Sequence, residues 1–368
     1  MTEHQIYSFI YIFLAWVFTL VLSERIFRMP DGCLLRRNNH SYAVVAFMIF
    51  LIVLMGFRPW TVGGDTGTYI NKYQDMIDGL YDPGESVRDW LFQQFQYICA
   101  QIMPVSLFFF IVACLYVSPI YISCNRFLRN NATFLLLAAM GAFSFFSYGV
   151  NGIRNGVATS FVLLALSYIS GNLKDKLLCA LFCFIAINCH ASALLPVVAM
   201  LLAFFYKNPK FMFYVWGISV LGSLIIGQSL SRILMIFGLD DRLMQYMTME
   251  ETSETEAAIA AARFRWDFLF YSFMPILMGG YCIFKKKICD LNYHLLLGTY
   301  MYANAVWVIL IRLPFTNRFA YLSWFLYAIV LTYPLLRFHL CINQGRKVAM
   351  IMMAHVSFTF LMYFYTGL

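Results

Sequence analysis

Long apolar runs alternate with short polar links along the whole chain. A helix needs roughly 20 mostly apolar residues to cross the hydrocarbon core of a bilayer, and most of the runs approach that length. The pattern therefore predicts an all-α, polytopic integral membrane helical bundle of about 12 transmembrane helices, in which residues 1–368 form a single transmembrane domain. The runs cover residues 5–24, 41–57, 105–124, 132–149, 155–170, 173–190, 191–208, 211–235, 268–284, 293–311, 319–336 and 348–366.

The longest uncharged stretch, residues 177–206, predicts two crossings instead of one. Its 30 residues would form a helix of about 45 Å, which is too long for one ordinary crossing. Lysines stand on both sides of it, and basic loops stay in the cytoplasm. We therefore expect the chain to cross the membrane, turn near residues 188–192 and cross back. The flanking lysines are Lys174, Lys176, Lys207 and Lys210.

The distribution of charge predicts the orientation. With twelve crossings and the amino terminus outside, the loops of one side hold 16 of the 26 Lys and Arg residues but only four of the 18 Asp and Glu residues. The opposite side holds the other 10 basic and 14 acidic residues. Because basic residues gather on the cytoplasmic side, we expect both termini to lie outside.

Two longer links, residues 58–104 and 236–267, both face outward in this arrangement. In the first, four apolar residues recur at helical spacing opposite four glutamines, which is typical of an interfacial or re-entrant helix. In the second, a Glu-rich stretch runs through alanines into Arg263 and Arg265, an order that suits the helix dipole. The second segment is either a lid or a solvated surface helix. The residues at helical spacing are Leu91, Phe95, Ile98 and Ile102, opposite Gln93, Gln94, Gln96 and Gln101.

The composition excludes most other classes of protein. The chain is 62% hydrophobic and 12% charged, against roughly 25% charged in a soluble domain, which excludes a soluble enzyme and a disordered chain. The net charge of +8 comes from short basic clusters between apolar runs, so we expect no nucleic-acid partner. The ten cysteines stand singly and predict no chemistry. The first run lacks a basic leader and a cleavage site, so we expect a retained span.

Polar residues at the outer ends of spans are the candidates for chemistry, because ionisable groups at membrane depth are costly. The first cluster, residues 57–69, follows the second run and contains three glycines within five residues. Glycines let a backbone turn tightly and present amide donors to an anion. Arg58 can neutralise phosphate, and Asp65 is the acid of the turn. A capping Asp and a snorkelling Arg would explain the same residues without any function.

The second cluster is Asn151-Gly152-Ile153-Arg154-Asn155-Gly156. An arginine at the outer start of a helix can present its planar guanidinium and nearby free amides to phosphate oxygens. The glycines at 152 and 156 could instead serve only to pack helices. The arginine between two asparagines favours the functional interpretation.

Two further clusters lie on the same predicted face. His190 stands in the turn between the sixth and seventh runs, where a lone histidine is otherwise often a structural residue. Arg312 and Arg318 flank a Pro-containing turn before the eleventh run. Their alternative role is snorkelling to lipid headgroups, but the positive-inside rule disfavours unneeded outer arginines.

Together the four clusters predict an outward site that holds a phosphate-bearing substrate while a base removes a proton. The sequence contains no metal-ligand cluster and no nucleotide-binding glycine motif, so we expect no metal and no cofactor. The arginines would then do what a divalent cation otherwise does for a leaving pyrophosphate.

At these residues the chain resembles the EpsG-like branch of the O-antigen and exopolysaccharide polymerases, the Wzy class. The matching elements occur in order over about residues 50–325. Asn155 departs from the pattern, because the family often has Gln after the Arg. The elements are Arg58…Gly64-Asp65-Thr66…Tyr69, then Asn151-Gly152-Ile153-Arg154-Asn155-Gly156-Val157-Ala158, then His190-Ala191-Ser192-Ala193, and finally Asn317-Arg318-Phe319.

The resemblance implies a GT-C-like glycosyltransferase of the bacterial inner (plasma) membrane that joins undecaprenyl-pyrophosphate-linked oligosaccharide repeat units at the outer, periplasmic face. Donor and acceptor would both be lipid-linked, and a Wzz-type chain-length regulator and a flippase are possible partners. With the base on the side of the anomeric carbon opposite the bound leaving group, the reaction would invert the configuration at that carbon. The implied catalytic residues are Asp65, His190 and Arg154, and the implied substrate-binding residues are Arg58, Gly64, Thr66, Tyr69, Asn151, Arg312, Asn317 and Arg318.

Other functions stay open at this point. A lipid-linked oligosaccharide flippase also has about twelve spans and cavity arginines, although such transporters usually show two related halves, which this sequence lacks. An O-antigen ligase uses the same donor with a different acceptor. A sugar acyltransferase is a weaker alternative.

Overall fold

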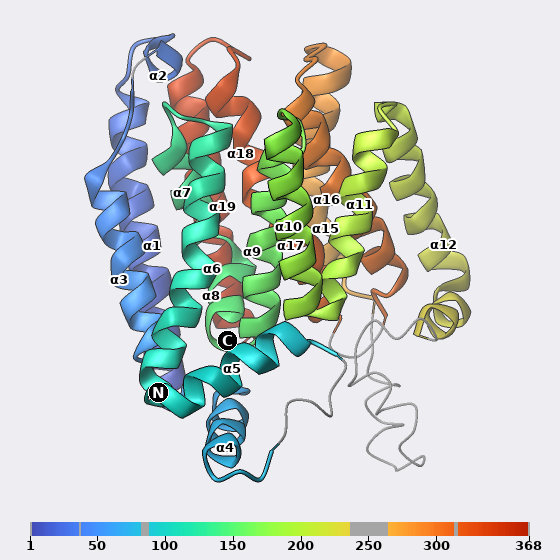
Figure 1. The fold of residues 1–368 in the computed structure, drawn as a ribbon. Helices are drawn as coiled ribbons and strands as arrows, with labels where there is room; N and C mark the ends of the chain where they lie inside the picture. Colours follow the sequence, from blue (N-terminus) through green and yellow to red (C-terminus); the bar gives the residue numbers. More distant parts are fainter. Residues whose placement is uncertain (1, 37, 82–87, 236–263, 313–315, 367–368) are drawn as a thin grey trace. The chain divides into compact units, whose positions relative to one another are not determined.

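The computed structural model describes residues 2–36, 38–81, 88–235, 264–312 and 316–366. Within these ranges the regular secondary structure is helical and no strand occurs (Figure 1). The helices are α1 Glu3–Phe27, α2 Cys33–Arg36, α3 Tyr42–Gly56, α4 Thr66–Ile77, α5 Trp90–Ile102, α6 Val105–Phe127, α7 Ala132–Met140, α8 Phe143–Val150, α9 Ile153–Tyr168, α10 Leu173–Cys189, η2 Ala191–Ala193, α11 Leu194–Phe205, α12 Pro209–Met235, α15 Trp266–Gly280, η3 Tyr281–Lys285, α16 Leu291–Ile309, α17 Asn317–Trp324, α18 Tyr327–Arg337 and α19 Gln344–Thr366.

The all-α membrane class is confirmed. Five of the described helices are long and apolar enough to cross a membrane, and the bent pair α7 and α8 brings the number to six. Each of the twelve apolar runs lies on helical residues, but several of those helices are shorter than 18 residues. Twelve crossings and a GT-C-like arrangement stay predictions.

One predicted span is broken. The run 132–149 forms α7 and α8, which meet at an angle of 71° around Gly141 and Ala142. The bend lets α8 end at Val150, directly before the cluster that begins at Asn151. It therefore contributes to where that cluster lies.

The described chain divides into two compact units, one of residues 1–193 and 328–368 and the other of residues 194–327. In the first unit, α1 packs along α19, α3 along α6, and α9 against both α6 and α10. In the second, α16 packs against α11, α12 and α17. That both units belong to a single transmembrane domain stays a prediction.

At one end of the first unit, hydrogen bonds join loops that the charge pattern places in the cytoplasm. The N–H of Asn39 donates to the carbonyl of Asn130 at 2.8 Å. The side chain of Asn131 donates to the carbonyls of Leu34 and Leu336, at 3.1 and 2.9 Å, and Asp31 accepts from the N–H of Asn343 at 2.9 Å. These loops come from three separate places in the sequence, around residues 31–39, 130–131 and 336–343, and carry many of the basic residues. The predicted sidedness is therefore self-consistent within this unit.

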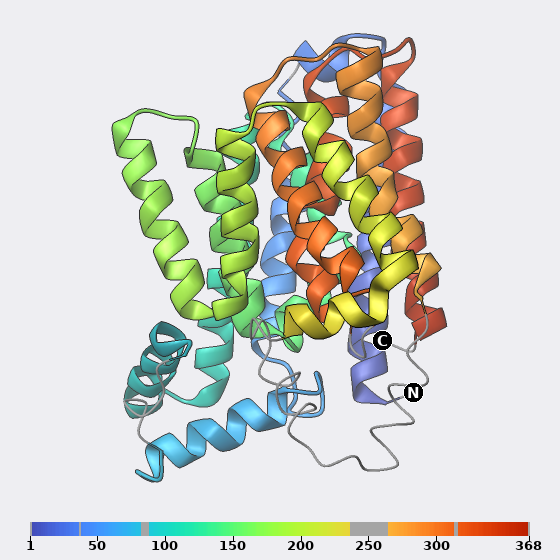
Figure 2. The ribbon, with the colours of Figure 1, turned by 90° about the vertical axis from the view of Figure 1, so that its right-hand side faces the viewer.

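The other end of the first unit carries both termini and the helices α4 and α5 (Figures 1 and 2). The helix expected in residues 58–104 is present as α5. Its apolar Ile98 and Ile102 are 57% and 70% exposed, whereas Gln93 and Gln96 are buried. The exposed isoleucines suit a helix at a lipid interface, but the two faces are not cleanly divided, since Gln101 is exposed and Phe92 is buried. The other long segment lies outside the described residues except for positions 264–267.

If the two ends of the first unit lie on opposite sides of the membrane, a reagent that cannot cross the membrane should reach residues at only one of them. Cys33 is exposed at the end with the basic loops, and Trp60 is 70% exposed at the end with α4. In intact spheroplasts that express the Trp60→Cys variant, a membrane-impermeant maleimide should label residue 60 and leave Cys33 unlabelled.

Peptide mass spectrometry resolves the two positions, and lysed spheroplasts provide the control in which both become labelled. Labelling of Cys33 without labelling of residue 60 in intact spheroplasts would show that the orientation is reversed.

Candidate functional site

Arg58 is the most deeply buried charged residue of the first cluster. Its side chain follows the end of α3 and is 7% exposed. Nε donates to the hydroxyl of Thr66 at 3.0 Å, Nη1 donates to the carbonyl of Met55 at 2.7 Å, and the guanidinium lies 4.2 Å from the ring centre of Phe109. Burial lowers the pKa of Arg58 to about 10, so it stays charged at neutral pH. The structure thus shows Arg58 and Thr66 holding the loop together, and a contact of either with substrate stays a prediction.

The glycines of the first cluster bring it against the second. Gly63 has a φ of +92°, and a Cβ there would lie 2.7 Å from the carbonyl oxygen of Val150 and 3.0 Å from Oδ1 of Asn151. The N–H of Gly63 donates to Nδ1 of His4 at 3.2 Å, and Gly64 also faces Asn151. Only a residue without a side chain fits this approach. Two motifs that lie about 90 residues apart in the sequence are therefore in direct contact.

Asp65 and Tyr69 continue the first cluster toward Arg154. Asp65 precedes α4 as its N-cap residue and is half-buried. Its negative charge lies near enough to Arg154 to favour the protonated guanidinium. Tyr69, one turn further along α4, accepts a hydrogen bond at its hydroxyl from Nε of Arg154 at 3.2 Å. The structure thus brings the predicted Tyr69 and Arg154 together.

The centre of the site is Asp89, which the sequence analysis does not single out. Its Oδ2 accepts a hydrogen bond from Nη1 of Arg154 at 2.7 Å and lies 2.9 Å from Nδ1 of His190. Its Oδ1 accepts from the N–H of Ala191 at 2.8 Å. The residue is 5% exposed, and its φ of +54° is uncommon for a residue with a side chain, although Asp tolerates it better than most. Strained, buried charges of this kind cluster at functional sites.

Asp89 stays ionised in this setting. Burial by itself raises the pKa of its carboxyl, but the hydrogen bond and charge of His190, the charge of Arg154 and the N–H of Ala191 outweigh burial. The pKa of Asp89 therefore lies below its ordinary value of 3.8. The carboxylate compensates Arg154 and orients the imidazole at the same time.

The predicted turn near residues 188–192 is present and supplies the third part of the site. α10 ends at Cys189, His190 is its C-cap, and η2 follows. The hydroxyl of Ser192 donates to Oδ1 of Asn155 at 2.9 Å, so the residue that departs from the family pattern directly joins the second and third clusters. The indole of Trp90 also donates to Oδ1 of Asn188, at 2.6 Å.

The fourth cluster belongs to the second unit. The guanidinium of Arg312 lies 5.2 Å from the ring centre of Phe264, and Asn317 begins α17 with Arg318 in its first turn. Thr316, just before them, accepts a hydrogen bond from the indole of Trp307 at 2.9 Å. A shared pocket of Arg312, Asn317 and Arg318 with the residues of the first unit stays a prediction.

The signal for Asp89 was weak but present. An acid directly before the amphipathic stretch that begins at Trp90 is a helix N-cap signature, and this one stands in a segment that the charge pattern predicts to face outward. Asp89 lies far along the chain from the glycine-rich turn and from Arg154. The sequence therefore does not show that these residues come together. Across the described residues no group of three His, Cys, Asp or Glu side chains is placed to hold a metal ion.

The close approach at Gly63 makes a prediction about stability. A Gly63→Ala change adds strain at a positive φ and forces the Cβ against Val150 and Thr66, so it should destabilise the protein by about 2–3 kcal/mol. Gly67 is the matched control, because a Cβ there meets nothing within 4 Å and Ala is favoured in a helix. Thermal unfolding in detergent should show a lower midpoint for Gly63→Ala and an equal or higher one for Gly67→Ala. Equal midpoints for wild type and Gly63→Ala would show that the loop does not pack in this way.

The lowered pKa of Asp89 predicts how stability depends on pH. A depressed carboxyl pKa contributes stability that is present above the ordinary value of 3.8 and is lost as pH falls through the lower folded value. Asp89→Asn should therefore cost about 1–3 kcal/mol at neutral pH, and this gap should not narrow between about pH 8 and pH 5. Unfolding of both proteins across this range checks it. A gap that closes by about pH 6 would contradict an ionised, paired Asp89.

Comparison with known proteins agrees with the motifs. The sequence model of the EpsG family matches residues 41–368, which covers the four clusters and Asp89. Searches among curated proteins and among solved structures found no match. Membership of this family indicates a polymerase-type function in polysaccharide synthesis, of the glycosyltransferase kind. Because the match extends over most of the chain, the protein belongs to the EpsG family.

Proposed function

We propose that the protein is a polysaccharide polymerase that joins oligosaccharide repeat units carried on undecaprenyl pyrophosphate at the outer face of the bacterial inner membrane. The growing glycan leaves its lipid pyrophosphate and is transferred to a sugar hydroxyl of the next lipid-linked unit. The observation that carries the proposal is the carboxylate of Asp89, which is shared by Arg154 and His190. It keeps an anion-binding group and a proton acceptor side by side.

His190 is suited to accept the proton from the attacking hydroxyl. If Nδ1 carries the hydrogen, it donates to Asp89, and the lone pair of Nε2 then accepts a proton from a substrate. The side chain of His190 is 23% exposed, so a ligand can reach it. Asp89 positions the ring and stabilises the imidazolium that forms. This geometry favours His190 over Asp65 as the base.

Arg154 is suited to hold the departing diphosphate. Its Nη1 donates to Asp89 and its Nε donates to Tyr69, while no described residue accepts a hydrogen bond from its Nη2. The side chain is 35% exposed. A guanidinium fixed by two partners is preoriented, and its remaining N–H groups can bind phosphate oxygens as negative charge develops on them.

The chemical step then needs only the groups described. The acceptor hydroxyl gives its proton to the base, its oxygen forms a bond to the anomeric carbon, and the bond from that carbon to the pyrophosphate oxygen breaks. The lipid diphosphate leaves with the bonding electrons, and arginine charge compensates it. Attack from the side opposite the leaving group inverts the anomeric carbon.

A ladder assay tests the proposal. Purified protein is incubated in detergent with lipid-linked repeat units from its own host, and the products are separated by length on a gel. Asp89→Asn and Arg154→Ala should each reduce the rate of ladder formation by on the order of 10²-fold or more, because the first loses the orientation of the base and the second loses the charge at the leaving group.

Asp78→Asn is the matched control, because Asp78 is exposed at the end of α4 and, among the described residues, its carboxylate accepts side-chain hydrogen bonds only from Gln74. It should keep the wild-type rate. A wild-type protein that forms no ladder would reject the polymerase. Unchanged substrate would then favour a flippase, and transfer to a lipid A-core acceptor would favour a ligase. Full activity of both site variants would reject the assigned residues.

A further inference from the structure

A histidine at the start of α1 holds the glycine-rich turn of the candidate site. The N–H of Gly63 donates to Nδ1 of His4 at 3.2 Å. Because the backbone N–H is the donor, Nδ1 is the unprotonated nitrogen of the ring, and the hydrogen of the neutral imidazole lies on Nε2. The contact therefore requires an acceptor atom at the position of Nδ1.

The backbone of the turn offers the N–H of Gly63 no other partner among the described residues. The N–H of Val62 donates to the carbonyl of Pro59 at 3.0 Å, and the N–H of Thr66 donates to the carbonyl of Gly63 at 3.1 Å. Neither bond uses the N–H of Gly63, and Gly63 is buried. A buried backbone N–H is nearly always paired, and leaving one unpaired is costly. His4 therefore supplies an acceptor that this turn needs.

The residue before His4 holds the same turn a second time. The hydroxyl of Thr61 donates to the carboxylate of Glu3. The start of α1 is itself fixed, because a capping box begins the helix and the hydroxyl of Tyr363 on α19 donates to the carbonyl of Gln5 at 2.6 Å. The first turn of α1 is thus a firm support for the glycine-rich turn.

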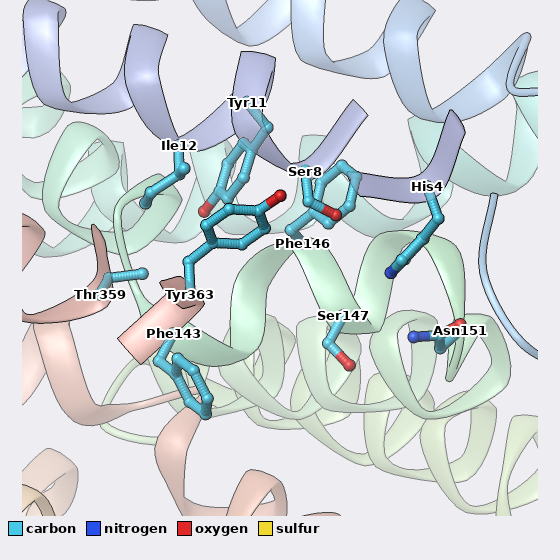
Figure 3. Close-up of a pocket in the computed structure, with 10 residues that line it drawn as sticks. All are labelled: His4, Ser8, Tyr11, Ile12, Phe143, Phe146, Ser147, Asn151, Thr359 and Tyr363. Carbon is cyan, nitrogen blue, oxygen red and sulfur yellow. The ribbon is translucent and has the colours of Figure 1, made fainter. Parts of the chain in front are cut away.

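The turn that His4 holds packs directly on the segment that carries Arg154. A Cβ on Gly63 would lie 2.7 Å from the carbonyl oxygen of Val150, so the two backbones are in contact. Figure 3 shows the imidazole of His4 extending from α1 toward the end of α8, where Asn151 lies. Arg154 follows in the first turn of α9.

The same turn also determines where α4 begins. α4 starts at Thr66, directly after the turn, and Tyr69 on this helix accepts the hydrogen bond from Nε of Arg154 at 3.2 Å. Loss of the contact between His4 and Gly63 would therefore loosen Tyr69 and Arg154 together.

His4 lies outside the part of the chain that matches the family. The EpsG match begins at residue 41, so it includes the glycine-rich turn but not the helix that holds it. The match therefore assigns no role to His4, and only the tertiary contact indicates one.

We propose that His4 is a positioning residue of the candidate site. Its Nδ1 fixes the glycine-rich turn, and through this turn it fixes Tyr69 and Arg154 for the departing diphosphate. His4 acts through the backbone of Gly63 and not by contact with substrate. The inference rests on the proposed function for the reaction that is positioned, whereas the hold on the turn can be measured without any substrate.

Two substitutions of His4 separate the acceptor atom from the rest of the side chain. His4→Phe keeps a flat ring of similar size but has no acceptor. His4→Asn is smaller, but its Oδ1 is bonded to Cγ, as Nδ1 is, and can accept the same hydrogen bond.

His40→Phe is the matched control. His40 is also half-buried and lies in the first unit, and its imidazole makes no hydrogen bond with the described residues. It contacts the ring of Tyr42 edge-on, with ring centres 5.0 Å apart, and a phenylalanine keeps an aromatic ring at this position.

Amide hydrogen exchange of the full-length protein in detergent, resolved by peptide mass spectrometry, measures the hold on the turn. In His4→Phe, peptides that cover residues 60–66 should exchange about 3- to 10-fold faster than in wild type, which is the effect of one lost hydrogen bond. In His4→Asn and His40→Phe, the same peptides should exchange as in wild type.

The rate of ladder formation measures the consequence for the reaction. His4→Phe should form the ladder about 3- to 10-fold more slowly than wild type, whereas His4→Asn and His40→Phe should keep the wild-type rate. A role in which the ring of His4 only fills space predicts the opposite order, because Phe fills that space and Asn does not.

The outcomes separate this inference from the proposed function. Unchanged exchange in His4→Phe, or equally fast exchange in His4→Asn, overturns the inference whether or not a ladder forms. Faster exchange in His4→Phe with an unchanged ladder rate also overturns it, because the turn would then not position the reacting groups. If wild type forms no ladder, the polymerase is rejected, and faster exchange in His4→Phe that is restored in His4→Asn still supports His4 as the residue that fixes the turn.

Discussion

The arrangement of the site depends on one buried carboxylate. Asp89 is 5% exposed and contacts Arg154, His190 and the N–H of Ala191. A buried charge is costly unless it is paired and hydrogen-bonded, so these three contacts are what allow Asp89 to be there. In return, the carboxylate joins the loop before α5, the start of α9 and the end of α10. Removing it would leave Arg154 without its ion-pair partner and His190 without the carboxylate that orients its ring.

Around Asp89, glycines let two segments of backbone pack directly against each other. Gly63 lies against Val150 and Asn151, and Gly156 has room for no Cβ, because one would lie 2.6 Å from the carbonyl of Tyr148. Arg58 occupies the space behind the loop and holds it through Thr66 and Met55. The charged residues of the site are therefore held in place by closely packed backbone and side chains. Electrostatic stabilisation of a transition state requires charged groups that are fixed in this way before the reaction.

The exposure of apolar side chains on α5 is consistent with a helix that contacts lipid. On α5, Ile98 and Ile102 are exposed while Gln93 and Gln96 are buried, although Gln101 is exposed and Phe92 is buried. Amide and charged groups gather inside, where Gln93 accepts from Lys72 and donates to the carbonyl of Arg88.

The sequence by itself determined the helical membrane class, the turn at His190 and the family, because apolar length and local motifs are properties of short segments. It also identified Arg154, Tyr69 and the glycine turn, which do meet. Only the tertiary structure showed that Asp89 is their common partner, that Arg58 is enclosed by the protein, and that His4 accepts the N–H of Gly63. Those facts depend on contacts between residues tens to hundreds of positions apart, and no local pattern encodes which distant side chain will fill a given space.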